Sequence, residues 1–175
     1  MLNKVTEYCV SFAVKEWLIE NKWDILAFNP PGSQGTFTIP NPSKMVGYRG
    51  QSGSNSPDIV AIYHGEKLLM IESKPAYVAS DVSKLVNFKS NLSRMSILMR
   101  LIEGVANAND IEFHNDAIQG GSMMIAIAIG STTPRLIHIP IFEVFKIDNM
   151  WDHEYINAKT DPYEFFRVKY YAPNE

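Results

Sequence analysis

Apolar residues recur along the start of the chain at the spacing of a helix. Residues 3–22 contain neither proline nor glycine. One apolar stripe consists of Val5, Cys9, Phe12 and Ile19, and a second consists of Val10, Val14 and Leu18. The remaining arc, which we expect to face solvent, carries Lys4, Ser11, Lys15 and Lys22. A helix that is apolar over most of its circumference is typical of packing between two partners.

A second helix is predicted over Asp81–Glu103. Its apolar residues follow a spacing of 3, 4, 3, 4 and 3, which is a continuous stripe facing a core, formed by Leu85, Phe88, Leu92, Met95, Met99 and Ile102. The polar stretch Asn107–Gly121 is predicted to be a loop.

Strands are predicted in several short apolar runs. Trp23–Phe28 is a short strand, and Ser56–Lys74 is a strand, a tight turn and a second strand. Met123–Ile129 is wholly apolar, as expected of a strand in the middle of a sheet. Leu136–Ile147 adds one or two strands, and the aromatic tail predicts a last edge strand with Phe165, Phe166, Val168 and Tyr170. This order of helices and strands predicts an α/β fold with a mixed central β-sheet flanked by α-helices.

Residues 29–56 form a long irregular segment rich in Pro, Gly, Ser and Asn. Such long loops in compact domains are usually functional or disordered. The segment carries Lys44, Tyr48 and Arg49, which suit base stacking and phosphate contacts if it touches DNA. The alternative is an ordinary Tyr–Arg pair on a surface loop.

The composition is that of a single soluble domain. The 175 residues are 46% hydrophobic and 20% charged, and the longest apolar run is too short to span a membrane. The single cysteine excludes an intrachain disulfide and fits a reducing compartment, and residues 1–20 do not resemble a signal peptide. We therefore expect a cytoplasmic protein that spans residues 1–175 as one domain.

The net charge of −3 does not indicate a nucleic-acid binder, but its distribution does. No acid occurs in residues 25–57 or 82–102, and these two stretches flank the predicted hairpin. A phosphate backbone that approaches the hairpin would meet positive potential there. Chance clustering of surface charge is the alternative. The second stretch supplies the further DNA-binding candidates Lys84, Lys89 and Arg100.

The predicted hairpin brings two acids and a lysine together. Because strand side chains alternate, Glu72 and Lys74 share one face, and the hairpin returns Asp58 beside Glu72. Two neighbouring carboxylates favour a hard divalent cation, Mg²⁺ or Mn²⁺, and the Ser73 carbonyl can add an oxygen ligand. Lys74 can orient or deprotonate water or stabilise transition-state charge. These residues favour phosphodiester hydrolysis. The alternative is a surface hairpin in which Glu72 and Lys74 form an ordinary ion pair.

Pro57-Asp58, followed after a gap by Glu72-Ser73-Lys74, resembles the motif of the PD-(D/E)xK nuclease superfamily. The layout is similar to type II restriction endonucleases and archaeal Holliday-junction resolvases. The resemblance implies a magnesium-dependent DNA endonuclease of restriction-endonuclease-like fold, with Asp58, Glu72 and Lys74 as catalytic residues. It also implies a glutamate from the first helix as a further metal ligand, for which Glu7 is preferred over Glu16.

The long segment before Asp58 favours a sequence-specific, restriction-type enzyme that acts on double-stranded DNA as a homodimer. A junction resolvase or repair nuclease acting on branched DNA is the main alternative. A catalytically inactive nuclease-like module for DNA binding or assembly is a further alternative, against which the intact Asp58, Glu72 and Lys74 argue.

Overall fold

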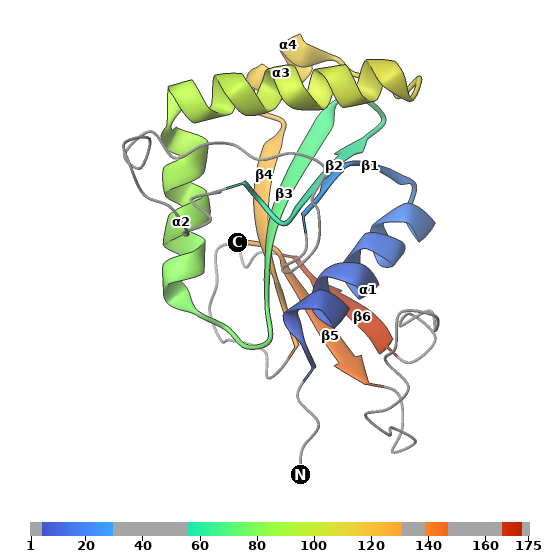
Figure 1. Ribbon diagram of the computed structural model, residues 1–175, viewed down its shortest axis with the longest axis vertical. Coiled ribbons are helices and arrows are strands. Elements are labelled where there is room, and N and C mark those ends of the chain that lie inside the picture. Colours follow the sequence, from blue (N-terminus) through green and yellow to red (C-terminus); the bar gives the residue numbers. More distant parts are fainter. Residues whose placement is uncertain (1–4, 30–55, 131–138, 147–165, 173–175) are drawn as a thin grey trace, which may run out of the picture.

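The computed structural model describes residues 5–29, 56–130, 139–146 and 166–172. These residues form a six-stranded sheet and four helices (Figure 1). The elements in chain order are α1 Glu7–Glu20, β1 Trp23–Phe28, β2 Ile59–Tyr63, β3 Lys67–Lys74, α2 Ala79–Ser90, α3 Leu92–Ala108, α4 Asn115–Gln119, β4 Met123–Ile129, β5 Ile141–Lys146 and β6 Phe166–Tyr171.

The strands lie in the sheet in the order in which they occur along the chain. β1, β2 and β3 form an antiparallel meander, whereas β3, β4 and β5 are parallel and β6 returns antiparallel to β5. The change from antiparallel to parallel pairing comes at β3, because the chain crosses through α2, α3 and α4 before it enters β4. The mixed sheet agrees with the sequence prediction, and β4 and β6 take the central and edge positions expected of them.

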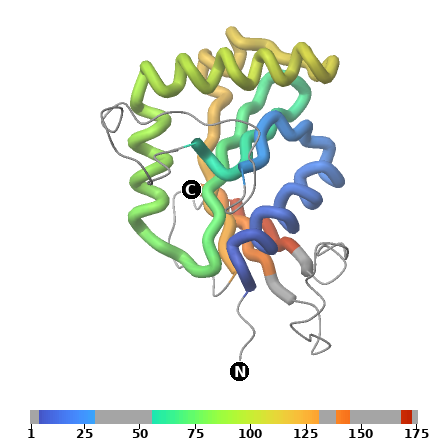
Figure 2. Tube along the Cα trace, viewed as in Figure 1, coloured from blue at the N-terminus to red at the C-terminus, as the bar shows by residue number. Residues whose placement is uncertain are grey.

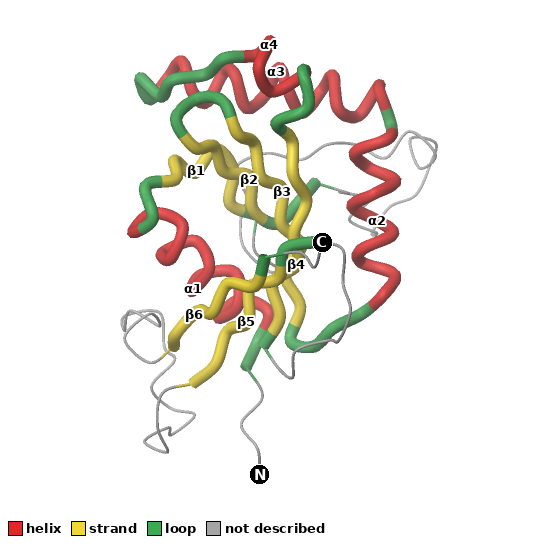
Figure 3. Tube along the Cα trace, turned by 180° about the vertical axis from the view of Figure 1, so that it is seen from behind, coloured by secondary structure: helices red, strands yellow, loops and turns green. Residues whose placement is uncertain are grey.

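Helices cover both faces of the sheet (Figures 1 and 3). Alternate side chains of the central strands enter two separate cores, as strand geometry requires. The core under α1 contains Ile59, Ala61, Leu69, Ile71, Ala126 and Ala128. The core under α2 and α3 contains Val60, Ile62, Leu68, Met70, Ile125 and Ile127. The α/β class is thus observed as three layers, with the sheet between two helical layers.

α1 is shorter than the predicted helix, and the face that it buries differs from the predicted one. Thr6 caps it by accepting a hydrogen bond from the Cys9 N–H at 3.2 Å, so the helix begins at Glu7. Ser11, predicted to face solvent, is wholly buried. α1 contacts all six strands, so the sheet extends under an arc wide enough to include this small polar side chain. Ile19, predicted within an apolar stripe, is instead exposed.

The predicted continuous helix over 81–103 is wrong, because the chain breaks at Asn91 into α2 and α3. α3 turns away from the axis of α2 at this point (Figure 2). Asn91 leaves helical geometry, ends α2, and accepts the Arg94 N–H with its side chain at 3.1 Å to cap α3. Asparagine favours such a cap because its side chain competes with helical hydrogen bonds. Leu92, placed by the predicted stripe in the core, is 85% exposed.

The predicted loop 107–121 is also partly wrong. α3 continues to Ala108, and α4 occupies Asn115–Gln119 with Ile118 buried against the core. Among the helices that the structure describes, none has the length and apolar character needed to cross a membrane.

Asn91→Ala tests the helix break. Loss of the side-chain cap is expected to lower the free energy of unfolding by about 1 kcal/mol. Chemical denaturation measures it, and Ser96→Ala on the exposed side of α3 is the matched control. An Asn91→Ala protein as stable as the wild type would contradict the capping role.

Candidate active site

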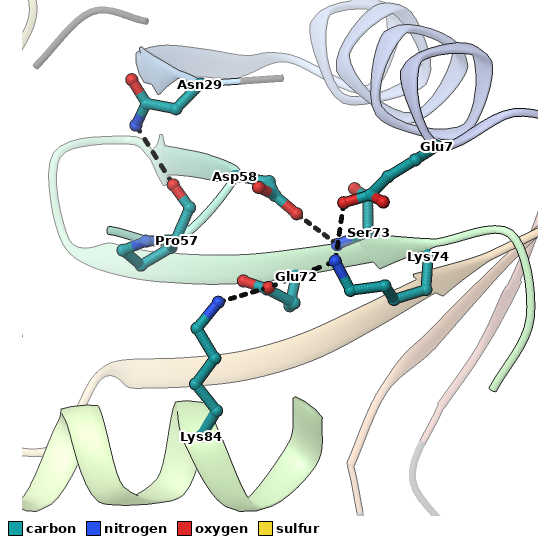
Figure 4. Close-up of polar contacts among 8 residues, drawn as sticks. All are labelled: Glu7, Asn29, Pro57, Asp58, Glu72, Ser73, Lys74 and Lys84. Atoms are coloured by element: carbon teal, nitrogen blue, oxygen red, sulfur yellow. Dashed lines mark hydrogen bonds and ion pairs between the residues drawn. The ribbon is translucent and has the colours of Figure 1, made fainter. Parts of the chain in front are cut away.

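The register of the hairpin places Asp58 across from Glu72. Ile59 pairs with Ile71 in the antiparallel ladder, so the preceding and following residues lie opposite one another. The Ser73 N–H donates to Asp58 Oδ2 at 2.7 Å, and this bond orients the Asp58 carboxylate beside the end of β3 (Figure 4). The predicted convergence of Asp58, Glu72 and Lys74 is therefore observed.

Asn29 holds the backbone at Pro57 and Asp58, which sequence reasoning did not anticipate. The Asn29 N–H donates to the Asp58 carbonyl at 2.7 Å, and its side-chain amide donates to the Pro57 carbonyl at 3.1 Å. These two bonds tie the end of β1 to the start of β2 across more than two dozen residues of intervening chain. The position of Asn29 directly after a predicted strand was the signal in the sequence for this role. The signal is weak because asparagine is common at the ends of strands.

Glu72 is the most deeply buried charged side chain of the site, with 2% of its surface exposed. Its Oε1 lies 2.6 Å from the Lys84 ammonium and 3.7 Å from the Lys74 ammonium. Its Oε2 is buried and has no hydrogen-bond partner among the residues that the structure describes. Lys84 was predicted to bind DNA, yet its side chain comes from α2 directly to the carboxylate.

Glu7 reaches the site from the opposite helical layer, as Figure 4 shows. Its Oε1 accepts a hydrogen bond from the Lys74 ammonium at 2.6 Å. The alternative helix acid, Glu16, pairs instead with Lys15 at 3.2 Å. The structure therefore places Glu7, and not Glu16, in the group.

Gly130 permits this approach of α1. A Cβ at Gly130 would lie 2.9 Å from Val5 Cβ, 3.1 Å from the Pro75 carbonyl oxygen and 3.1 Å from Val10 Cγ2. The Gly130 N–H also donates to the Lys74 carbonyl at 3.2 Å. The absence of a side chain thus lets the start of α1 lie close to the end of β3, where Glu7 meets Lys74.

Burial makes both hairpin carboxylates poor acids. Burial first, and the Glu72 charge second, raise the pKa of Asp58 from 3.8 to about 7, although the Ser73 N–H and Lys74 oppose the rise. Burial likewise raises the pKa of Glu72, against the effect of Lys84 and Lys74, and the nearby Asp81 carboxylate adds to the rise. Both groups would gain from a further positive charge.

Lys74 is held in its protonated form. Burial favours the neutral amine, but the hydrogen bond to Glu7 and the charges of Glu72, Glu7 and Asp58 together outweigh it and raise the pKa of Lys74. In this arrangement Lys74 is a cation and a hydrogen-bond donor to Glu7.

The donor set of the site fits a hard divalent cation. Asp58 and Glu72 offer the carboxylate oxygens that such a cation prefers, and within the described part of the chain the buried Glu72 Oε2 has no hydrogen-bond partner. Within the described ranges, however, no three His, Cys, Asp or Glu side chains come together as a metal-ligating group. Glu7 bonds to Lys74, so its role as a metal ligand stays a prediction, as does that of the Ser73 carbonyl.

The other predicted DNA-binding residues lie apart from these acids. Lys89 donates to the Met123 carbonyl at 2.9 Å, at the start of β4 and thus the far end of the sheet from Glu72. Lys89 and Arg100 both line a cavity of about 620 Å³ there. Lys44, Tyr48 and Arg49 lie outside the described residues.

Comparison with protein-family models, with curated proteins and with solved structures found no match to this chain.

Asp58→Asn tests the electrostatic cost of the site. The folded pKa of Asp58 lies above 3.8, so the folded protein binds more protons than the unfolded chain between about pH 4 and 7. The contribution of Asp58 to stability therefore falls as the pH rises through this window. In metal-free buffer at pH 8, Asp58→Asn is expected to be about 1–3 kcal/mol more stable than the wild type, with little difference near pH 4.

Urea denaturation with a chelator present, repeated across this pH range, measures the effect. Asp24→Asn, at an exposed position of β1, is the matched control. An Asp58→Asn protein that is less stable than the wild type at pH 8 would show that the ionised Asp58 carboxylate does not destabilise the folded protein.

Gly130→Ala tests the close approach of α1. The new methyl group is expected to push against Pro75 and α1 and to lower the free energy of unfolding by about 1–3 kcal/mol. Gly104→Ala in α3 is the control, because a Cβ there meets nothing within 4 Å. It is expected to stabilise by about 0.5–1 kcal/mol. Equal responses of the two variants in thermal denaturation would contradict the packing argument.

Proposed function

We propose that this protein is a magnesium-dependent DNA endonuclease of restriction-endonuclease-like fold. The observation that carries the proposal is that Asp58, Glu72 and Lys74 lie together at one end of the hairpin. Glu7 adds to this group by accepting a hydrogen bond from Lys74. This group contains two buried carboxylates, whose negative charges favour binding of a cation. It also contains a lysine that is held in its positively charged form. The motif that they form resembles that of the PD-(D/E)xK nucleases, and the mixed sheet with helices on both faces is compatible with that fold.

Asp58 and Glu72 would hold the metal ion. A bound Mg²⁺ lowers the pKa of water and withdraws charge from a phosphoryl oxygen. The protein residues supply the surroundings for that chemistry. The Ser73 N–H holds the Asp58 carboxylate in place, and the burial of Glu72 excludes water from one side of the site. Mn²⁺ is expected to substitute for Mg²⁺ because both prefer oxygen ligands.

Lys74 would stabilise negative charge on the phosphate. Its protonated ammonium is partly accessible, with 27% of the side chain exposed, and the hydrogen bond to Glu7 fixes its direction. A positioned cation acts strongly where charge develops in the transition state. Glu7 is thus a positioning residue for Lys74, in addition to the metal-ligand role expected from the resemblance.

The substrate is proposed to be double-stranded DNA cut at a specific sequence by a homodimer. The support comes from the sequence alone, from the long segment that precedes Asp58 and from the two acid-free stretches beside the hairpin. Most of that segment lies outside the described residues.

Lys74→Ala tests the catalytic role. Loss of the ammonium is expected to reduce Mg²⁺-dependent cleavage of a mixed-sequence plasmid by about 10²–10³-fold, with folding and DNA binding retained. Lys67→Ala, at the other end of the same strand, is the matched control and is expected to cut normally. Cleavage that survives in the Lys74→Ala protein would contradict the assignment of the site.

The same digestion distinguishes the substrate classes. Discrete plasmid fragments would indicate a restriction-type enzyme. Intact plasmid together with cleavage of a four-way junction would indicate a resolvase. A wild-type protein that cuts neither substrate in Mg²⁺ or Mn²⁺ would overturn the proposed nuclease function in favour of a binding module.

A further inference from the structure

The proposed function uses Asp58, Glu72, Lys74 and Glu7 but assigns no role to the Lys84 contact. The Lys84 ammonium lies 2.6 Å from Glu72 Oε1, the same separation as that between Lys74 and Glu7. The bond links α2 to the end of β3, as Figure 4 shows. Among the residues that the structure describes, Lys84 is thus the nearest positive charge to the most buried acid of the site.

The two lysines have different partners. The Lys74 ammonium is hydrogen-bonded to Glu7 Oε1 at 2.6 Å and lies 3.7 Å from Glu72 Oε1. Lys84 makes its direct bond to Glu72 itself. The charge of Glu72 is therefore balanced mainly from α2, and Lys74 remains with Glu7.

The Lys84 side chain can move away from Glu72 without disturbing the fold. The next residue, Leu85, is buried, as is Phe88 one turn on, so these residues anchor the α2 backbone. The Lys84 side chain is 36% exposed, whereas that of Glu72 is 2% exposed. The flexible Lys84 side chain ends near solvent and can therefore move away from the site. The Glu72 carboxylate is buried and stays in place when the ammonium moves.

We propose that Lys84 is a built-in counter-ion that competes with the divalent cation for Glu72 and so sets the metal affinity of the site. This inference rests on the proposed metal-dependent function. A dication that enters beside Asp58 and Glu72 would share the Glu72 carboxylate with the Lys84 ammonium on Oε1, and the two cations repel one another. Metal binding therefore works against the Lys84 charge, and the affinity is lower than two buried carboxylates alone would provide.

Lys84→Met tests the competition without any DNA. In isothermal titration calorimetry with Mn²⁺ alone, the variant is expected to bind about tenfold more tightly than the wild type, because the metal no longer meets the Lys84 charge at the Glu72 carboxylate. Lys89→Met is the matched control: it removes the same charge from the same helix, but Lys89 bonds to the Met123 carbonyl at the far end of the sheet. Its Mn²⁺ affinity is expected to equal that of the wild type.

Thermal denaturation gives a second readout. Without metal, Lys84→Met is expected to melt at a lower temperature than the wild type, because Glu72 loses its nearest partner. Saturating Mn²⁺ is expected to raise its melting temperature by more than it raises that of the wild type. Lys84→Gln, which keeps a hydrogen-bond donor and removes only the charge, applies the same test if the methionine variant does not fold, and it is also expected to bind Mn²⁺ more tightly.

Mn²⁺ affinity that is unchanged or weaker in the Lys84 variants would overturn the inference, since a merely structural role of Lys84 predicts weaker binding. A change of equal size in Lys89→Met would overturn it as well, because the effect would then be one of overall charge. If neither the wild type nor the Lys84 variants bind Mn²⁺, the inference fails together with the metal-dependent function. Tighter binding in the variants of a protein that cuts no DNA would support the inference and refute the nuclease proposal.

Discussion

The buried negative charge of Glu72 is the constraint around which the site is arranged. A carboxylate with 2% exposure at the end of β3 is costly unless positive charge lies close to it. Two lysines supply that charge, Lys84 from α2 and Lys74 from the strand itself. Asp58 adds a second acid with a raised pKa, so the site remains short of positive charge. Such a site is suited to a divalent cation, and this is the physical basis of the proposed nuclease chemistry.

The site depends on backbone contacts as much as on its charged side chains. Asn29 holds the peptide at Pro57 and Asp58, and the Ser73 N–H holds the Asp58 carboxylate. Gly130 allows the start of α1 to reach the end of β3, which brings Glu7 to Lys74. Contacts from α1 and from the ends of β1 and β4 thereby converge on the hairpin of β2 and β3, and none of the supporting residues Asn29, Ser73 and Gly130 carries a charge.

Local patterns predicted the hairpin and the charged residues within it. Asp58, Glu72 and Lys74 lie within one hairpin, where alternation and register alone determine which side chains meet. The same logic failed over residues 81–103, because the apolar spacing continues through Asn91 while the helix does not. Leu92 fitted the predicted stripe and is exposed. A hydrophobic period reports which residues can share a face, but a single capping side chain is enough to turn the axis.

The amino-acid order alone was sufficient for the α/β class, the mixed sheet, the central β4 and the acidic hairpin, since each follows from short-range periodicity. The pairing of Glu7 with Lys74, the position of Lys84 on Glu72 and the bracing by Asn29 required the folded chain. Lys84 shows the reason most clearly: from its neighbours in sequence it is one of several basic residues on a helix. Its partner is determined by how α2 packs on the sheet, and packing between layers is set by the whole core and by no local pattern.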